Sequence, residues 1–101
     1  MIMVRRVYTP KPGEGGKLLR VIKQIQPATV EAGFPPLTVY RQSHGAHGTL
    51  VTEQKWQSAA DYEKSRDMVR QTQSITQLFE QVYPLLAATH VTDLYDEVEP
   101  D

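Results

Sequence analysis

Two helical stretches are interleaved with four β-rich stretches in the order β-α-β-β-α-β, and this order limits the fold more than any other feature of the chain. The β-rich stretches are residues 2–9, 37–43, 49–56 and 89–98, which are rich in β-branched and aromatic residues. The order is that of a ferredoxin-like α+β fold, with a four-stranded antiparallel sheet and helices on one face. With 101 residues, the chain is expected to form a single domain over residues 1–101.

The first helical stretch covers residues 14–33. Pro27 is expected to kink or interrupt this helix, because a proline ring clashes with the preceding turn. Gly33 is expected to end it, since glycine is favoured just after a helix. Apolar residues at helical spacing predict its buried side: Leu18, Leu19, Ile22 and Ile25.

The second helical stretch covers residues 59–83. Ser58 is a predicted N-cap, with Asp61 at the acidic position of a capping box. Ser74 is predicted to cap a second helical segment. An apolar stripe predicts the buried side of that segment: Ile75, Leu78, Phe79 and Val82.

Two histidines, His44 and His47, lie between the second and third β-rich stretches, and each is followed by a glycine. The pattern favours the tip of a β-hairpin, where glycines supply a positive φ. A catalytic zinc needs three protein ligands, and the nearest later carboxylate, Glu53, is six residues past His47. A metal or general-base role for the two histidines, or a dimer contact, is the alternative.

Composition excludes several classes of function. The net charge of −1 and the lack of a basic block give no electrostatic basis for binding nucleic acid or an anionic membrane. The chain has no cysteine, hence no disulfide or thiolate chemistry, which suits the cytoplasm. No apolar run is long enough to span a membrane. Neither a metal nor another cofactor is predicted.

Both faces of the predicted sheet carry apolar residues. In residues 2–9, Ile2, Val4 and Tyr8 alternate with Met3 and Val7. Helices would cover one of these faces, so the other is expected to pack against a second sheet. Two identical subunits related by a two-fold axis would provide that sheet, which predicts a homodimer.

Three segments resemble a known family: RRVYTPKPGEGGKLL, EQKWQSAADYEK and VTDLYDEVEP. They are similar to the dimeric α/β-barrel superfamily, in particular its NIPSNAP-like and antibiotic-biosynthesis-monooxygenase-like members. The resemblance spans nearly the whole chain and implies a homodimeric barrel. It implies no single reaction, because members include cofactor-independent oxygenases, heme-degrading enzymes, isomerases and proteins without an assigned reaction.

The resemblance also implies a site beside Trp56. In the family's oxygenases a tryptophan at a strand end and an aromatic residue on the next helix, here Tyr62, line a substrate cavity. Those oxygenases have asparagine where this chain has Thr52, and the heme-degrading members have histidine where it has Arg66. Both departures weaken the match to those reactions. The alternative role for Trp56 is to cover the edge of the core.

Arg6 and Tyr8 share one face of the first β-rich stretch. If this face points inward, Arg6 needs an anionic partner, which a bound carboxylate or enolate would supply. The alternative is an internal ion pair between Arg6 and either Glu53 or Asp93.

Together these features predict a protein that binds a small, apolar or aromatic molecule between sheet and helices. If it is an enzyme, a cofactor-independent oxygenase is favoured, which would bind, desolvate and deprotonate its substrate. The alternative is a non-enzymatic ligand-binding or assembly module. An open pocket with convergent polar groups favours the enzyme, and a filled space favours the module. The predicted ligand-binding residues are Trp56, Tyr62, Thr52, Arg6 and Tyr8.

Overall fold

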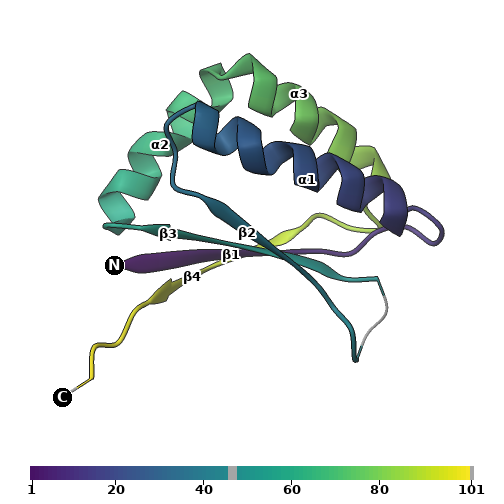
Figure 1. The fold of residues 1–101 in the computed structure, drawn as a ribbon, viewed down its shortest axis with the longest axis horizontal. Coiled ribbons are helices and arrows are strands. Elements are labelled where there is room, and N and C mark those ends of the chain that lie inside the picture. The colour runs from purple at the N-terminus through teal and green to yellow at the C-terminus, as the bar shows by residue number, and fades with distance from the viewer. Residues whose placement is uncertain (46–47, 101) are drawn as a thin grey trace.

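The computed structural model describes residues 1–45 and 48–100 and has the predicted β-α-β-β-α-β order, with the second helical stretch divided in two. One antiparallel sheet has the strand order β2-β3-β1-β4. All the helices lie on one face of this sheet (Figure 1), which confirms the ferredoxin-like prediction. The elements are β1 (Ile2–Tyr8), α1 (Gly15–Glu31), β2 (Leu37–Arg41), β3 (Leu50–Trp56), α2 (Ala59–Gln71), α3 (Gln73–Val82), the 3-10 turn η1 (Tyr83–Leu85) and β4 (Val91–Asp96).

Residues of β1 and β3 alternate between the helix-covered face and the outer face of the sheet. Val4 lies opposite Gln54, and two residues further on Arg6 lies opposite Thr52. These side chains face the helices, and Val4, Thr52 and Gln54 are buried. Because the side-chain period of a strand is two, their neighbours in sequence lie on the outer face. The inner face of the two central strands therefore forms the floor on which the helices rest.

Helix α1 continues through Pro27, so of the two expected effects the interruption is wrong, and the kink stays a prediction. A proline removes one backbone hydrogen bond from the helix, and the carbonyl it leaves free belongs to the exposed Lys23. Two residues after the proline, the buried Thr29 hydroxyl donates to the Ile25 carbonyl oxygen at 2.7 Å. Gly33 has a φ of 87°, which confirms that the chain leaves the helix through a glycine.

Ser58 caps α2 as predicted, and its hydroxyl oxygen accepts a hydrogen bond from the Asp61 backbone N–H at 3.1 Å. The predicted cap at Ser74 is wrong. Helix α3 begins at Gln73, after the extended residue Thr72. The Thr72 hydroxyl donates to the Met68 carbonyl oxygen at 2.8 Å, so it satisfies the end of α2 instead of capping α3.

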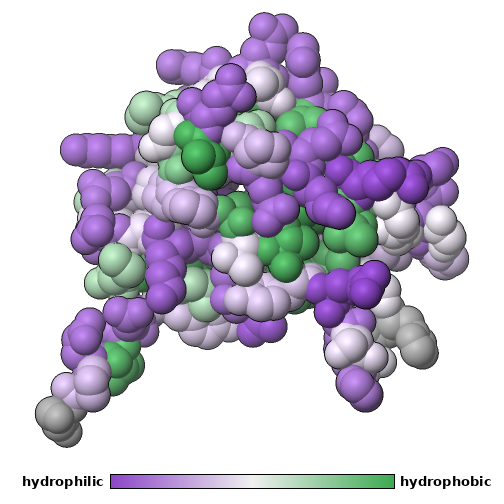
Figure 2. All heavy atoms as spheres, in the orientation of Figure 1, coloured by the Kyte–Doolittle hydropathy of each residue, from purple (hydrophilic) through white to green (hydrophobic). Residues whose placement is uncertain are grey.

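The buried core lies between the sheet and the helices in two adjoining clusters. One cluster joins α1 to the C-terminal end of β1 and includes the fully buried Leu18 and the nearly fully buried Ile22. The other surrounds Trp56 and includes Val4 and Tyr62. Figure 2 shows hydrophilic side chains over the helices and apolar ones in the band between helices and sheet. Within residues 1–45 and 48–100, no helix has the length and apolar character needed to cross a membrane.

The loop between β2 and β3 carries the two histidines of the metal hypothesis. His44 is exposed, and its Nδ1 lies 3.2 Å from the Ser43 hydroxyl. Gly45 and Gly48 have φ values of 100° and 78°, as a hairpin tip requires. His47 lies outside the described residues. Among those described, no three histidine, cysteine, aspartate or glutamate side chains gather as potential metal ligands.

Candidate functional site

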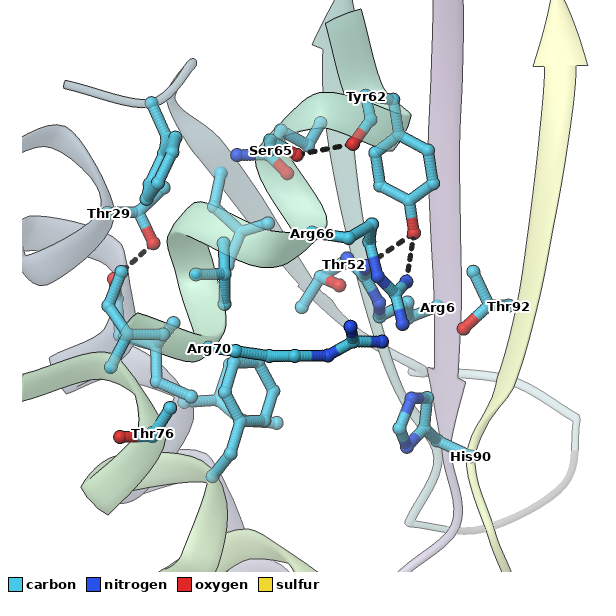
Figure 3. Close-up of a pocket in the computed structure, with 18 of the residues that line it drawn as sticks. Arg6, Thr29, Thr52, Tyr62, Ser65, Arg66, Arg70, Thr76, His90 and Thr92 are labelled. Atoms are coloured by element: carbon cyan, nitrogen blue, oxygen red, sulfur yellow. Dashed lines mark hydrogen bonds between the residues drawn. The ribbon is translucent and has the colours of Figure 1, made fainter. Parts of the chain in front are cut away.

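A cavity of about 380 Å³ lies between the inner face of the sheet and the helices. Strands β1, β3 and β4 form its floor, and α1, α2 and α3 form its sides (Figure 3). The sequence placed five ligand-binding residues here, and the structure brings all five to the lining: Arg6, Tyr8, Thr52, Trp56 and Tyr62.

One wall of the cavity is aromatic. Trp56 closes β3 and is only 8% exposed. The centroid of its ring is 5.8 Å from that of Tyr62, in an edge-to-face arrangement, and 6.3 Å from that of Phe34. Offset and edge-to-face contacts of this kind stabilise aromatic clusters. Trp56 therefore belongs to the core and also lines the cavity, so the two roles considered for it are compatible.

The Trp56 indole is held by a buried polar side chain. Its Nε1–H donates to Gln54 Oε1 at 3.2 Å, and Gln54 Nε2 donates to the Pro35 carbonyl oxygen at 2.7 Å. Gln54 is 7% exposed, so water has little access to replace a missing partner. This chain of hydrogen bonds fixes the indole orientation at the edge of the cavity.

We expect Trp56→Phe to lower the free energy of unfolding by about 1–3 kcal/mol, because it leaves Gln54 Oε1 buried without a donor. It should also weaken binding of any ligand that contacts the indole. Denaturant unfolding of Trp56→Phe, Gln54→Met and the double variant measures the coupling. Gln54→Met also removes the donor to the Pro35 carbonyl oxygen. This happens in the single and in the double variant alike, so its cost cancels from the coupling energy. If the losses in unfolding free energy of the two single variants add up to that of the double variant, the hydrogen bond between Trp56 and Gln54 does not have this role.

Two arginines converge on the Tyr62 hydroxyl from different elements. Arg6 Nη2, from β1, donates to this oxygen at 2.9 Å, and Arg66 Nη1, one turn further along α2, donates to it at 2.5 Å. The two guanidinium carbons lie 5.9 and 5.6 Å from the centroid of the Tyr62 ring. The result is a pair of cations at the cavity, bridged by one phenol oxygen.

The alternative ion pair of Arg6 with Glu53 or Asp93 is wrong. Both carboxylates lie opposite Arg5 across the sheet, so they are on the outer face. Arg6 lies opposite Thr52 and Thr92, and points toward the helices. No salt bridge joins Arg6 to a carboxylate within the described part of the chain.

His90, just before β4, adds a titratable group on the opposite side of the cavity from Tyr62 (Figure 3). Its ring centroid is 5.0 Å from that of Tyr8 and 6.1 Å from that of Tyr83. Burial lowers the His90 pKa below its ordinary value, and the positive charges of Arg6 and Arg66 lower it further. The imidazole is thus kept neutral at neutral pH, and its buried Nδ1 has no hydrogen-bond partner among the described residues.

Two hydroxyl groups complete the polar part of the lining. Burial raises the pKa of Tyr8 to about 12, against the opposing effect of the nearby Arg6, so the phenol remains protonated and can donate a hydrogen bond. Thr52 is 2% exposed, and its side chain is a hydrogen-bonding neighbour of Tyr8 that lowers the Tyr8 pKa against the effect of burial.

Sequence reasoning missed His90 and gave Arg66 no role in binding. Arg66 had a usable signal, since residues four apart on a helix lie on the same side and Tyr62 was already placed at the cavity. His90 had none, because its position depends on the register between β1 and β4. That register places Thr92 opposite Arg6, so His90, two residues before Thr92, is on the same face.

Comparison with solved structures finds the same fold in proteins of low sequence identity. An uncharacterized NIPSNAP domain protein from Burkholderia xenovorans superposes with a TM-score of 0.82 at 13% identity, over 100% of both chains. An antibiotic biosynthesis monooxygenase superposes with a TM-score of 0.79 at 17% identity, over 98% of this chain and 100% of that chain. A NIPSNAP family protein from Agrobacterium tumefaciens superposes with a TM-score of 0.80 at 14% identity, over 97% of this chain and 93% of that chain.

No protein-family model and no curated protein matches the chain. The structural matches show that it has the ferredoxin-like fold of NIPSNAP and antibiotic-biosynthesis-monooxygenase proteins, as the sequence resemblance implied. At such identities the likeness concerns the fold, and one fold serves many functions. The activity has to be argued from the cavity itself.

Proposed function

We propose that the cavity binds a small molecule with an apolar or aromatic body. The observation that carries this proposal is a cavity of about 380 Å³ with Trp56 and Phe34 on one wall and polar groups converging on another. Ligand sites typically have volumes of ~300–1,000 Å³, mostly apolar linings and a few well-placed polar groups. An apolar body fits against the aromatic wall, and the polar groups would fix its orientation.

Titration of the intrinsic fluorescence with aromatic and polyketide-like compounds tests this proposal. Trp56 is the only tryptophan, so a saturable change in its emission reports on the cavity wall. The same compounds should raise the melting temperature, because a ligand that binds only the folded state stabilises it. Unchanged emission, melting temperature and acrylamide quenching with every compound would contradict ligand binding.

Cofactor-independent oxygenation is the reaction that the site favours. Its support is the presence of a neutral, partly buried imidazole at His90 and of the cationic groups Arg6 and Arg66 in the same cavity. A neutral imidazole can accept a proton, and nearby positive charge stabilises the anion that forms. One protein of the same fold carries the name antibiotic biosynthesis monooxygenase, which agrees with this choice but does not establish it.

In the proposed reaction, a C–H bond of an activated methylene breaks, and its proton passes to the His90 imidazole. The electron pair stays on the substrate as a carbanion, which forms a bond to molecular oxygen. The peroxide anion that forms takes the proton back from the His90 imidazolium, and the resulting hydroperoxide loses water to leave a carbonyl group, so that R₂CH₂ and O₂ give R₂CO and H₂O. Oxygen uptake with anthrone, with the product identified as anthraquinone, tests this reaction. No uptake above the protein-free rate, with anthrone bound, would favour the non-enzymatic module.

We also propose that the protein is a homodimer formed through the outer face of the sheet. This face carries exposed apolar side chains, including Tyr40, Val91 and Tyr95, and no described helix covers it. At its centre the Nε of Arg5 is buried without a hydrogen-bond partner among the described residues. A second sheet packed on this face would bury the apolar side chains, and we expect it to bury more than ~1,200 Å² in total.

A further inference from the structure

The side chains of Arg6, Arg66 and Tyr62 form one hydrogen-bonded group at the cavity. Arg6 is half-buried on β1, and Arg66 is an exposed residue of α2 that lines the cavity on the same side of the helix as Tyr62. Each donates to the Tyr62 hydroxyl oxygen (Figure 3), which holds two like charges close together. Like charges at this separation repel each other, so an anion beside them would stabilise the arrangement.

The protein supplies little negative charge to this group. Three arginines line the cavity, Arg6, Arg66 and Arg70, but Glu80 is the sole carboxylate among the lining residues of the described chain. Arg70 already has a partner, since its Nη1 lies 3.1 Å from Asp67 Oδ1. Neither Arg6 nor Arg66 forms a salt bridge within the described ranges. The compensating anion would therefore have to come from outside the described chain.

Hydrogen-bond geometry gives the Tyr62 hydroxyl a defined role. A phenol oxygen has two lone pairs and one proton, and here the two guanidinium groups occupy the lone-pair sites. The Tyr62 proton therefore remains free to be donated. Each guanidinium has five N–H donors, and only one of each is used on Tyr62. The group offers several donors and no free acceptor, which is the pattern required by an anionic oxygen.

We infer that Arg6, Arg66 and Tyr62 form an oxyanion clamp, and that the ligand is an aromatic molecule carrying a negatively charged oxygen. This inference rests on the proposed binding function and names its ligand class. The aromatic body lies against Trp56, and the charged oxygen lies at the two guanidinium groups. The charge belongs either to a carboxylate or to an ionised phenol or enol, which share this recognition chemistry.

Calorimetry with two probes of the same shape tests the clamp. We expect 2-naphthoate to bind at least about tenfold more tightly than the neutral 2-naphthamide, because a charge-assisted pair contributes more than a neutral one. Arg66→Gln and Arg6→Gln should each weaken binding of 2-naphthoate about tenfold more than binding of 2-naphthamide. Arg20→Gln, which removes the same charge from the exposed side of α1, is the matched control and should leave the preference intact.

A third probe separates the two sources of the negative charge. With 2-naphthol, a clamp that accepts phenolates lowers the pKa of the bound probe, so the naphtholate absorption band appears near pH 7 and is lost in Arg66→Gln. If 2-naphthoate is preferred over 2-naphthamide and 2-naphthol shows no naphtholate band, the clamp binds carboxylates. If the naphtholate band appears and 2-naphthoate is bound little better than 2-naphthamide, the clamp binds phenolates or enolates.

The possible failures are distinguishable. Equal affinity for 2-naphthoate and 2-naphthamide, together with no naphtholate band, overturns the clamp and leaves the cavity as a binding site. A preference that survives both arginine substitutions also overturns it. No binding of any of the three probes overturns the clamp and the proposed binding function together. Circular dichroism and melting temperature verify that each variant is folded.

Discussion

We expect Val91→Lys to convert the proposed homodimer into a monomer under conditions in which Val30→Lys leaves it dimeric. Val91 lies on the outer face of the sheet, opposite Val7 of β1, whereas Val30 lies on α1. Both valines are 55% exposed in the single chain, so the two substitutions perturb the isolated subunit to a similar degree. A difference in oligomeric state between the two variants therefore reports whether a second subunit covers the outer face of the sheet in solution.

The expected size of this effect follows from the two-fold symmetry of a homodimer. A substitution in such an interface occurs twice, and each lysine would bury a charge without a partner. We expect the dissociation constant to rise by more than about 100-fold, or ~3 kcal/mol. Light scattering at micromolar concentration measures the mass, which for the unmodified protein should be twice the 11.5 kDa of the chain. A monomeric mass for the unmodified protein would rule out the proposed dimer.

The positions of the elements were predictable because each has a local signal. Ser58 caps α2, Gly33 follows α1 with a positive φ, and Trp56 ends β3, all as the sequence indicates. The exceptions also have local causes. Helix α1 tolerates Pro27, and α3 begins at Gln73, so Ser74 lies inside this helix and not at its cap position.

The site was only partly predictable because it depends on strand register. A shift of one residue moves every side chain of a strand to the other face. Sequence alone does not show that Arg5, and not Arg6, lies opposite Glu53 and Asp93. The same register brings His90 onto the face that Arg6 occupies. Trp56 and Tyr62 of the aromatic wall could be predicted, and so could Arg6, Tyr8 and Thr52, but Phe34, Arg66 and His90 were not placed at the cavity.

The register-dependent residue His90 is the one on which the proposed reaction depends. Replacing it with glutamine should keep anthrone binding and lower the rate of oxygen uptake by ~10²–10⁴-fold, the usual contribution of a general base. His44→Gln makes the same change in the exposed loop between β2 and β3, and should retain the full rate. An unchanged rate in His90→Gln, with anthrone bound, would show that His90 is not the base.

The pH dependence of this rate gives a second, independent test of His90. Only the neutral imidazole accepts a proton, so the rate should fall as the pH falls through the His90 pKa. Burial and then the charges of Arg6 and Arg66 lower that pKa, so the midpoint of the acidic limb should lie below 6.5, the ordinary value of an imidazole. Arg66→Gln removes one of the charges that lower the pKa. Its acidic limb should therefore move to higher pH, whereas Arg20→Gln, on the exposed side of α1, should not move it. If the acidic limb stays at the same pH in Arg66→Gln, the group that titrates does not respond to the charge of Arg66. The pH dependence would then belong to a group other than His90.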